Sequence, residues 1–316
     1  MTFFSTRYGE LTGITSFHMH ENGHIKDCML KDMVILDTPC GKLIPQYEYA
    51  HPRKRHIKSV SFYESGALKS LSLNQQTHID TPLGALPAEF VTFYESGGIS
   101  RLFPLNGQLS SYWDEDDEYR LAREQEFCFT FGKFKAKPIG IYFYEDGCVK
   151  GVTLWSGEII DIATPIGKQK VCTGFSVHPN GAVKSFEPPS PIYVTSPIGT
   201  LLVSDPEPLT IYRDKYSVVF NEDGTLKSLI TSRNKITVND EKKQPHQYIP
   251  ANIYDTLYGT KAYYKSLKIE FLQGKVCFKG KDTYNVHDCS FQIEPYSASI
   301  KPVCQECSDC GQCISG

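Results

Sequence analysis

A glycine-centred motif recurs along the first 230 residues and constrains the fold more than any other feature. Apolar and polar residues alternate before each glycine, which is the period-two pattern of a strand with one buried face. Asn, Asp or Ser directly precedes the glycine, and Asn-Gly or Asp-Gly between alternating apolar runs predicts a tight β-hairpin turn. The six copies are centred on Gly23, Gly66, Gly97, Gly147, Gly181 and Gly224, and two of them contain the same pentapeptide, FYESG.

The residues after the glycine predict a return strand with one irregularity. The second and fifth positions are apolar in every copy, as at Leu68 and Leu71, and the third position is lysine in all copies but one, where Ser100 replaces it. In a regular strand, positions three apart point to opposite faces. Both apolar residues can face the core only if one residue between them is looped out, so we expect a β-bulge in each return strand.

A second signature follows four of the six copies. It reads DTPCG (37–41), DTPLG (80–84), ATPIG (163–167) and TSPIG (195–199). The residue before the proline follows the glycine of its copy by 15, 15, 17 and 15 residues, which indicates one inherited unit. Proline and glycine at these positions, between β-rich flanks, predict a further hairpin turn.

These patterns predict an all-β protein of tandem β-hairpin repeats. A single hairpin cannot bury its apolar face alone, so neighbouring hairpins must stack and share a core. The alternative is a β-propeller, whose four-stranded blades also span about 40–45 residues. Successive glycines are separated by 43, 31, 50, 34 and 43 residues. This irregular spacing favours an open or solenoid-like meander over a closed ring of blades.

The repeat resembles a known family. FYESGALKS and FYEDGCVKG are similar to MORN-type repeats, especially the variant of the YwqK antitoxin-like family, with its aromatic, Asn-Gly and Lys pattern. The resemblance covers the six glycine hairpins, about a quarter of the chain, while the TP-x-G signature departs from a compact MORN array. It implies an elongated sheet of tandem hairpins that acts as an interaction platform.

The repeat signal also divides the chain. We expect a hairpin-repeat domain at 1–238 with an insertion at 106–137, a C-terminal β extension at 239–303 and a cysteine-rich tail at 304–316. The extension contains LKIEFLQGKVCFKG, which predicts one last hairpin that turns at Gly274.

The insertion carries an acidic run, Asp114 to Glu118, followed by helix-compatible LAREQEF (121–127). Acidic residues stabilise the first turn of a helix, so we expect the run to begin a short helix. The alternative is a site for a divalent cation or a basic partner.

The cysteine-rich tail is the one segment that indicates a specific chemistry. Its first three cysteines reproduce the C-x2-C-x2-C run with which bacterial ferredoxins hold a [4Fe–4S] cluster, although the spacing to the fourth differs and no proline follows it. An iron–sulfur cluster is the preferred interpretation, held by all four thiolates of the run or by three of them together with Cys277 or Cys289; zinc bound by four thiolates and metal-free redox thiols are the alternatives. The candidate ligands are Cys304, Cys307, Cys310 and Cys313.

Two further groups are candidate binding residues. His18, His20 and His24 surround the first turn and are a candidate metal site, although sister copies place ordinary surface residues there. The residue three before the glycine is aromatic in most copies and faces a lysine across the turn. Stacked hairpins would align these residues into a stripe that suits a protein partner, or that packs only against the lysine stems. The candidate partner-binding residues are Tyr63, Tyr94 and Tyr144.

Composition narrows the function classes. The formal net charge of −3 gives no general attraction to nucleic acid, and no apolar stretch is long enough to span a membrane. The N-terminus lacks the pattern of a signal peptide, so we expect a cytoplasmic protein with free thiols. The sequence shows no catalytic motif, which favours a binding protein over an enzyme.

Overall fold

The computed structural model divides the chain into two compact units. Unit 1 comprises 1–189 and 208–225, and unit 2 comprises 190–207 and 226–316. The predicted boundary at 238 falls inside unit 2. The structure describes residues 3–49, 53, 57–107, 109, 112–205, 216–240, 245–254 and 262–297.

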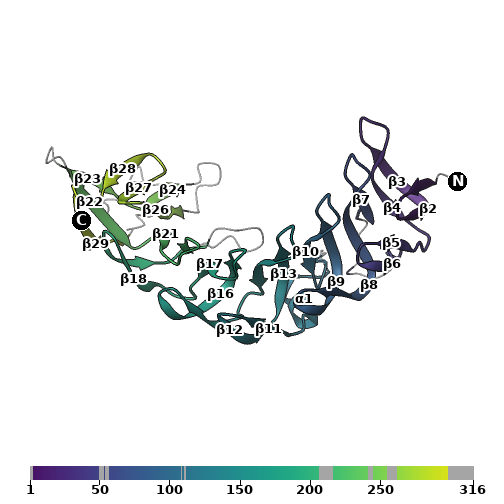
Figure 1. Ribbon diagram of the computed structural model, residues 1–316, viewed down its shortest axis with the longest axis horizontal. Coiled ribbons are helices and arrows are strands. Elements are labelled where there is room, and N and C mark those ends of the chain that lie inside the picture. Colours follow the sequence, from purple (N-terminus) through teal and green to yellow (C-terminus); the bar gives the residue numbers. More distant parts are fainter. Residues whose placement is uncertain are drawn as a thin grey trace, which may run out of the picture. The chain divides into compact units, whose positions relative to one another are not determined.

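Unit 1 is built on one antiparallel sheet in which successive hairpins pair edge to edge (Figure 1). This arrangement confirms the predicted all-β meander of hairpins, because a propeller would separate the strands into blades. Its strands, in chain order, are β3 (Ile14–Met19), β4 (Ile25–Leu30), β7 (Val60–Phe62), β8 (Leu68–Thr81), β9 (Gly84–Phe93), β10 (Ile99–Phe103), β13 (Pro138–Phe143), β14 (Val149–Leu154), β16 (Gly167–Val177), β17 (Val183–Glu187) and β20 (Val218–Phe220).

The predicted bulge is present in the first five glycine hairpins, both strands of which belong to unit 1. Phe62 pairs with Leu68 and Ser61 with Ser70, so Lys69 is skipped in the register. The turn glycines have positive φ, for example +77° at Gly66, which side chains rarely adopt. The residues skipped in the five hairpins are Lys26, Lys69, Ser100, Lys150 and Lys184.

The bulges hold apolar residues of both strands on one face of the sheet. A row of directly paired residues crosses the sheet on this face, and its members are at most 1% exposed; we call it the core row. Because each hairpin contributes equivalent positions, the hairpins share one continuous core. The core row consists of Cys28, Val60, Leu71, Val91, Leu102, Ile141, Val152, Phe175, Phe186 and Val218.

The TP-x-G signatures form the second set of hairpin turns, as predicted. In each, the hydroxyl of the residue before the proline donates to the glycine carbonyl, as from Thr81 to Gly84 at 2.8 Å. Thr6 makes the same contact with Gly9 between β1 (Phe4–Thr6) and β2 (Gly9–Leu11). The other turns join β5 (Leu36–Thr38) to β6 (Gly41–Leu43), β15 (Ile160–Thr164) to β16 and, in unit 2, β18 (Ile192–Ser196) to β19 (Gly199–Val203).

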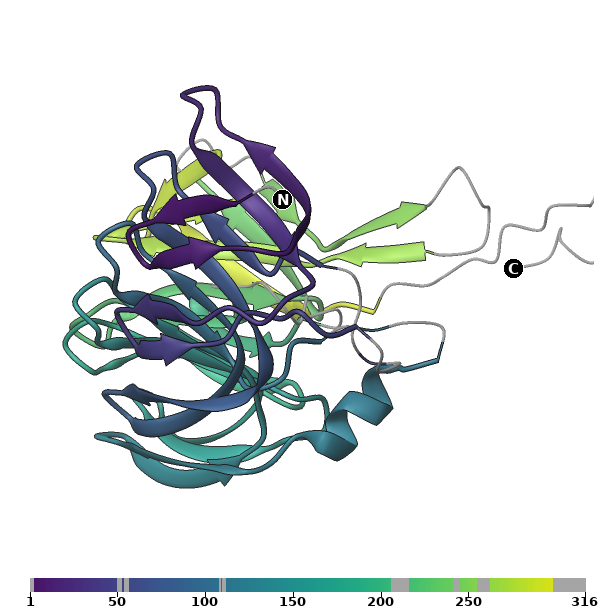
Figure 2. The same ribbon diagram turned by 90° about the vertical axis from the view of Figure 1, so that its right-hand side faces the viewer.

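The insertion contains a helix, α1 (Glu115–Leu121), that lies at one side of the stacked hairpins of unit 1 (Figure 2). Asp114 is its N-cap and forms a reciprocal capping box with Asp117. The acidic run therefore begins a helix, as predicted. The helix does not extend to residue 127: β11 (Gln125–Phe129) and β12 (Gly132–Ala136) form a hairpin, in which Phe127 is buried.

Unit 2 is also almost entirely β. One sheet has the order β28-β27-β26-β21, another places β22 between β23 and β29, and β24 pairs with β25. The predicted hairpin at Gly274 is confirmed. No helix in the described part of the chain has the length and apolarity needed to cross a membrane. The strands are β21 (Leu226–Thr231), β22 (Asn234–Asn239), β23 (Pro245–Tyr248), β24 (Ala251–Tyr254), β25 (Ala262–Lys265), β26 (Leu267–Leu272), β27 (Lys275–Phe278), β28 (Asp282–Asn285) and β29 (Ser290–Pro295).

Candidate ligand-binding trough

The predicted aromatic stripe joins each hairpin of unit 1 to the next. The Tyr63 hydroxyl donates to the carbonyl of Phe93 at 2.8 Å, and the Tyr94 hydroxyl donates to the carbonyl of Phe143 at 2.8 Å. The acceptor is always the residue four before the glycine of the following hairpin. The same contact is made by His20 to Phe62 (3.0 Å), Tyr144 to Val177 (2.9 Å) and His178 to Phe220 (3.1 Å).

These tyrosines are half-buried and lie beside basic side chains. The Lys69 amine is 5.4 Å from the ring centre of Tyr63, and the Lys150 amine is 6.0 Å from that of Tyr144. Burial and the neighbouring Glu95 carboxylate raise the pKa of Tyr63. The stripe thus has a structural role between hairpins, and its role in binding a partner stays a prediction.

The face of the sheet opposite the core carries a second row of paired residues, which we call the open-face row. Its residues are mostly small and polar, and they differ from hairpin to hairpin. Arg101 and Tyr142 are direct partners within it, with the guanidinium 5.9 Å from the tyrosine ring centre. The row consists of Asp27, Ser61, Ser70, Thr92, Arg101, Tyr142, Gly151, Ser176 and Ser185.

Three adjoining hollows follow this row and form one trough. The first, of about 550 Å³, extends from Ser16 to Asn106 and shares Asp27 and Lys58 with the second, of about 490 Å³. The third, of about 260 Å³, shares Arg101 with the second and ends at Thr153 and Ser176. The trough therefore crosses several hairpins, which suits an extended ligand.

The floor of the trough is basic. Among the described residues, its lining includes five Lys or Arg side chains and a single carboxylate, that of Asp27. Asp27 already accepts hydrogen bonds from Lys58 and from His18, both at 2.7 Å. Burial raises the pKa of Asp27, but these hydrogen bonds and charges outweigh it and hold the pKa below its usual value. The remaining cations are Lys26, Lys69, Arg101 and Lys150.

Two buried polar atoms at one end of the trough have no hydrogen-bond partner among the residues that the structure describes. They are the hydroxyl of Ser72, a residue that is 1% exposed, and the side-chain amide nitrogen of Asn106. Both residues line the first hollow. An unsatisfied buried polar group costs about 1–3 kcal/mol. A ligand with a polar acceptor at this place would satisfy both groups.

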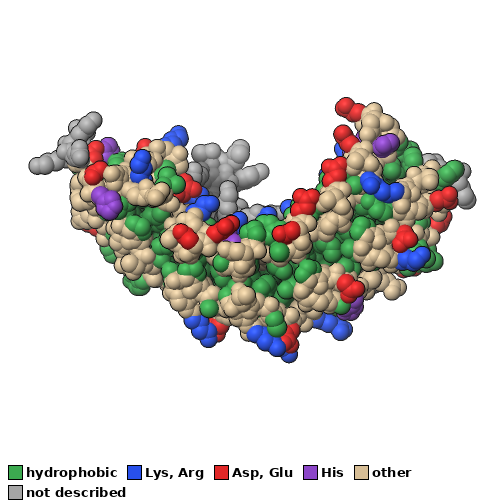
Figure 3. Space-filling model, in the orientation of Figure 1, with side chains coloured by type: hydrophobic (Ala, Val, Ile, Leu, Met, Phe, Trp, Pro, Cys, Tyr) green, Lys and Arg blue, Asp and Glu red, His purple; other side chains and the backbone are tan. Residues whose placement is uncertain are grey.

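A rim of acidic side chains borders the basic floor. The position two before the turn glycine is glutamate in most copies, and Figure 3 shows acidic side chains in succession along the hairpin tips of unit 1. The rim restricts the kind of ligand that can bind, because a long stiff polyanion lying across the hairpin tips would be repelled by these carboxylates. The exposed rim residues include Glu21, Glu64, Glu95, Glu145 and Glu222.

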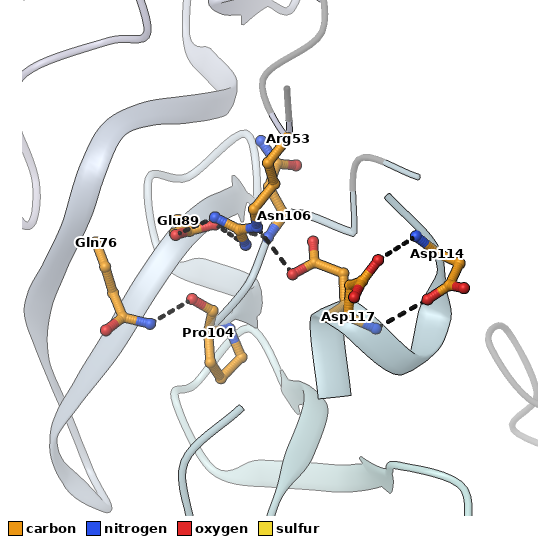
Figure 4. Close-up of polar contacts among 8 residues, drawn as sticks. Arg53, Gln76, Glu89, Pro104, Asn106, Asp114 and Asp117 are labelled. Carbon is orange, nitrogen blue, oxygen red and sulfur yellow. Dashed lines mark hydrogen bonds and ion pairs between the residues drawn. The ribbon is translucent and has the colours of Figure 1, made fainter. Parts of the chain in front are cut away.

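A separate charged cluster fastens α1 to the sheet (Figure 4). The Arg53 guanidinium donates to Glu118 of α1 at 2.8 Å and to both oxygens of Glu89 on β9 at 2.8 and 2.6 Å. Burial lowers the pKa of Arg53, but the hydrogen bonds and charges of the two glutamates outweigh it and leave the pKa raised. The network satisfies both oxygens of Glu89 and one of Glu118, whereas the other Glu118 oxygen, Oε1, is buried without a hydrogen-bond partner among the described residues.

The structure does not test the metal ligands predicted in the C-terminal tail. Cys304, Cys307, Cys310 and Cys313 lie outside the described residues. Within the described ranges, no group of three or more His, Cys, Asp or Glu side chains is placed to hold a metal ion. The three histidines that were weighed as a candidate metal site do not form such a group: the rings of His18, His20 and His24 are directed at Asp27, at the Phe62 carbonyl and at the Glu64 carbonyl, respectively.

The cysteines in the repeats behave as packing residues. Burial raises the pKa of Cys28 to about 12 and that of Cys40 to about 11, so both remain uncharged thiols at neutral pH. Cys277, considered as an additional cluster ligand, is buried in β27, and Cys289 is half-buried. Cys148 is exposed after its turn glycine, as predicted.

Sequence reasoning identified the tyrosine stripe and the lysines beside it but missed the open-face row. The positions of this row lie five before and four after the glycines, where the copies disagree: Ser61, Thr92 and Tyr142 are equivalent, for example. That disagreement beside strictly repeated apolar positions is the signal that would have identified them. Comparison with known proteins finds no family model, curated protein or solved structure that matches this chain.

Proposed function

We propose that the protein is a recognition scaffold that binds an extended acidic segment of a partner protein in the trough of unit 1. The basic floor is the observation that carries the proposal: Lys26, Lys69, Arg101 and Lys150 line a continuous hollow whose one carboxylate is already paired. Opposite charge steers a ligand and fixes its register.

The uncharged groups of the floor fit a peptide. Hydroxyls of the open-face row can bond to a backbone or to carboxylates, and the rings of Tyr94 and Tyr142 offer rigid contact area. The unpartnered groups of Ser72 and Asn106 provide a fixed anchor for one acceptor of the ligand. A peptide also fits the acidic rim better than a nucleic acid duplex does, since a flexible chain can enter between the tips and the floor.

A titration with a labelled acidic peptide tests this function. The probe is a fluorescent ten-residue peptide of alternating Glu and Tyr, and the control probe has Lys in place of Glu. We expect saturable binding of the acidic probe that weakens between 50 and 300 mM salt, because added salt screens exposed charges over roughly 10 Å. Absence of binding, or equal binding of both probes, would overturn the proposal.

Charge reversal locates the site. Arg101→Glu and Lys69→Glu are expected to weaken binding by about tenfold or more, since each removes an attraction and adds a repulsion. Lys42→Glu makes the same change in charge on exposed β6, outside the trough, and is the matched control. If Lys42→Glu and Arg101→Glu weakened binding equally, the loss of affinity would follow from net charge alone, and the trough would not be the binding site.

A cofactor function of the cysteine tail is the second candidate, and it rests on the sequence C-x2-C-x2-C-x2-C at 304–313. We propose that the four thiols bind an iron–sulfur cluster or zinc. The protein would then be a redox or metal accessory protein whose scaffold docks a partner and whose tail carries the metal. Iron, sulfide and zinc content after anaerobic purification tests it, with a chain truncated after Val303 as the control. Equal iron and sulfide, lost on truncation, are expected for a cluster; zinc alone would select the other metal, and metal-free protein would remove both.

A further inference from the structure

The first hairpin of unit 1 leaves apolar residues exposed that all later hairpins bury. Four residues before the glycine, Met19 is 41% exposed, and six before it, Phe17 is 42% exposed. The equivalent residues of the five later copies are at most 2% exposed: Phe62, Phe93, Phe143, Val177 and Phe220 at the first position, and Val60, Val91, Ile141, Phe175 and Val218 at the second. The chain thus contains five examples of how such residues are normally covered.

In those examples, the preceding hairpin pairs with the strand that carries these residues, and other segments add apolar cover, as Phe129, Phe131 and Phe134 do over Phe175. The return strand of one hairpin pairs antiparallel with the outgoing strand of the next, as β4 does with β7 and β8 with β9. The preceding hairpin also places a Tyr or His side chain on the carbonyl of the residue four before the next glycine. Each junction therefore combines strand pairing, apolar cover and one side-chain hydrogen bond.

The outer edge of β3 presents the receiving half of this junction. In the part of the chain that the structure describes, β3 pairs with β4 alone. The carbonyl of Met19 occupies the position of the acceptors in later hairpins. The strand sequence ITSFHM contains no Lys, Asp, Glu or Pro, which are the residues that usually protect an edge strand from further pairing.

The far end of the array does not supply the matching half. Asn221 occupies the donor position of the sixth copy, and its side-chain amide bonds back to the Thr225 hydroxyl at 3.0 Å. The next strand, β21, is already paired with β26. Among the described residues, the sixth hairpin therefore offers no free return strand with an aromatic donor, which argues against head-to-tail assembly of the repeats.

We propose that the outer edge of β3 binds a β-hairpin of the same repeat type from another protein, with Tyr or His three residues before its turn glycine. The return strand of that hairpin pairs antiparallel with Ile14–Met19. Its aromatic side chain donates to the Met19 carbonyl, and its apolar residues cover Phe17 and Met19. This edge adjoins the trough, whose first hollow begins at Ser16 and His18 of β3, but Phe17 and Met19 do not line it, and the inference does not depend on what the trough binds.

The chain's own second hairpin is the most direct probe, because at its native junction it presents all three elements. A backbone-cyclised peptide of residues 58–73 avoids the marginal stability of an isolated hairpin. Added to isotopically labelled protein, it is expected to shift the amide resonances of residues 14–19 saturably. The Tyr63→Phe peptide lacks only the hydroxyl that would reach Met19, and we expect it to bind about three- to tenfold more weakly.

Variants of the protein locate the contact. Phe17→Lys places a charge on the exposed edge and is expected to abolish the shifts. Met33→Lys, at a more exposed apolar residue outside β3, is the matched control and should keep them. The proposal would be overturned if the peptide shifted resonances elsewhere, or if both peptides bound equally well. It would also be overturned if the resonances of β3 shifted with protein concentration alone, because that result would assign the edge to a second copy of this chain.

Discussion

The two faces of the sheet in unit 1 differ in how they use the repeat. The core row is built from equivalent positions that are apolar in every hairpin and nearly inaccessible to solvent. The open-face row is built from their direct neighbours in sequence, and it varies from Asp27 through Ser61 to Arg101. The same strands therefore carry a uniform face and a varied face. The difference indicates that the repeated apolar positions specify the fold, whereas the varied open-face row, together with the repeated lysines beside it, forms the surface proposed to bind a partner.

The largest effect is expected within the core row itself. Phe175 and Phe17 occupy the same repeat position, but Phe175 is 1% exposed and contacts the rings of Phe129, Phe131 and Phe134. Phe175→Ala should lower the free energy of unfolding by about 3–5 kcal/mol, and Phe17→Ala by clearly less because its ring is already partly in water. Denaturant unfolding of both variants measures this. Equal decreases in the free energy of unfolding would show that the position in the repeat, and not burial, determines how much each phenylalanine contributes to stability.

One open-face position is expected to behave like the core. A Cβ added at Gly151 would lie 2.7 Å from the Phe175 carbonyl oxygen, so the neighbouring backbone would have to shift. We expect Gly151→Ala to lower the free energy of unfolding by about 2 kcal/mol, as overpacked sites do. Ser70→Ala, in the same row, should change it by less than about 1 kcal/mol. A tolerated Gly151→Ala would mean that the hairpins separate more easily than the junction geometry implies.

The aromatic stripe borders the trough, since Tyr63 and Tyr94 line its hollows, and should have an intermediate effect. Tyr94→Phe removes the hydroxyl that donates to the Phe143 carbonyl and should lower the free energy of unfolding by about 1 kcal/mol. Tyr193→Phe, on exposed β18 of unit 2, is the control and should have no measurable effect. If the two variants are equally stable, the stripe does not hold the hairpins together, and a role in partner binding alone would remain for it.

The smallest effect concerns acid stability. The pKa of Asp27 is lowered in the folded state, so its contribution to stability is present above the unfolded-state pKa and is lost as pH falls through the folded-state pKa. We therefore expect Asp27→Asn to flatten the dependence of unfolding free energy on pH between about 5 and 2. Asp37→Asn, at an exposed aspartate of β5, is the control. Parallel pH profiles for wild type and Asp27→Asn would contradict the assignment.

The sequence predicted the parts of the fold that depend on local pattern. The glycine turns, the bulge at Lys69 and its equivalents, and the TP-x-G hairpins follow from backbone conformation and side-chain parity, which a single copy already shows. The turn at Thr6 was missed because it has no proline, although the hydroxyl contact that defines the turn needs only Thr and Gly. The hairpin of β11 and β12 was missed because its strands lie next to a strong helix signal.

The candidate site was harder to predict because it depends on which strands become neighbours. Tyr63 was placed on the correct face, but its bond to Phe93 depends on the pairing between hairpins. Arg101 and Tyr142 are 41 residues apart in sequence and become partners only through the junction of β10 and β13. A trough made from such pairs has no motif in a single copy. Its position follows from aligning the copies and asking where they differ.

Replacing open-face residues by those of sister hairpins tests the central claim most directly. The double variant Arg101→Ser and Tyr142→Ser introduces the residues found at equivalent positions, Ser70 and Ser61. Affinity for the acidic peptide and the free energy of unfolding should be measured on the same samples. We predict that affinity falls at least about tenfold while the free energy of unfolding changes by less than about 1 kcal/mol. Unchanged affinity, or a loss of affinity that only accompanies a loss of stability, would contradict the division between a repeated face that folds and a varied face that binds.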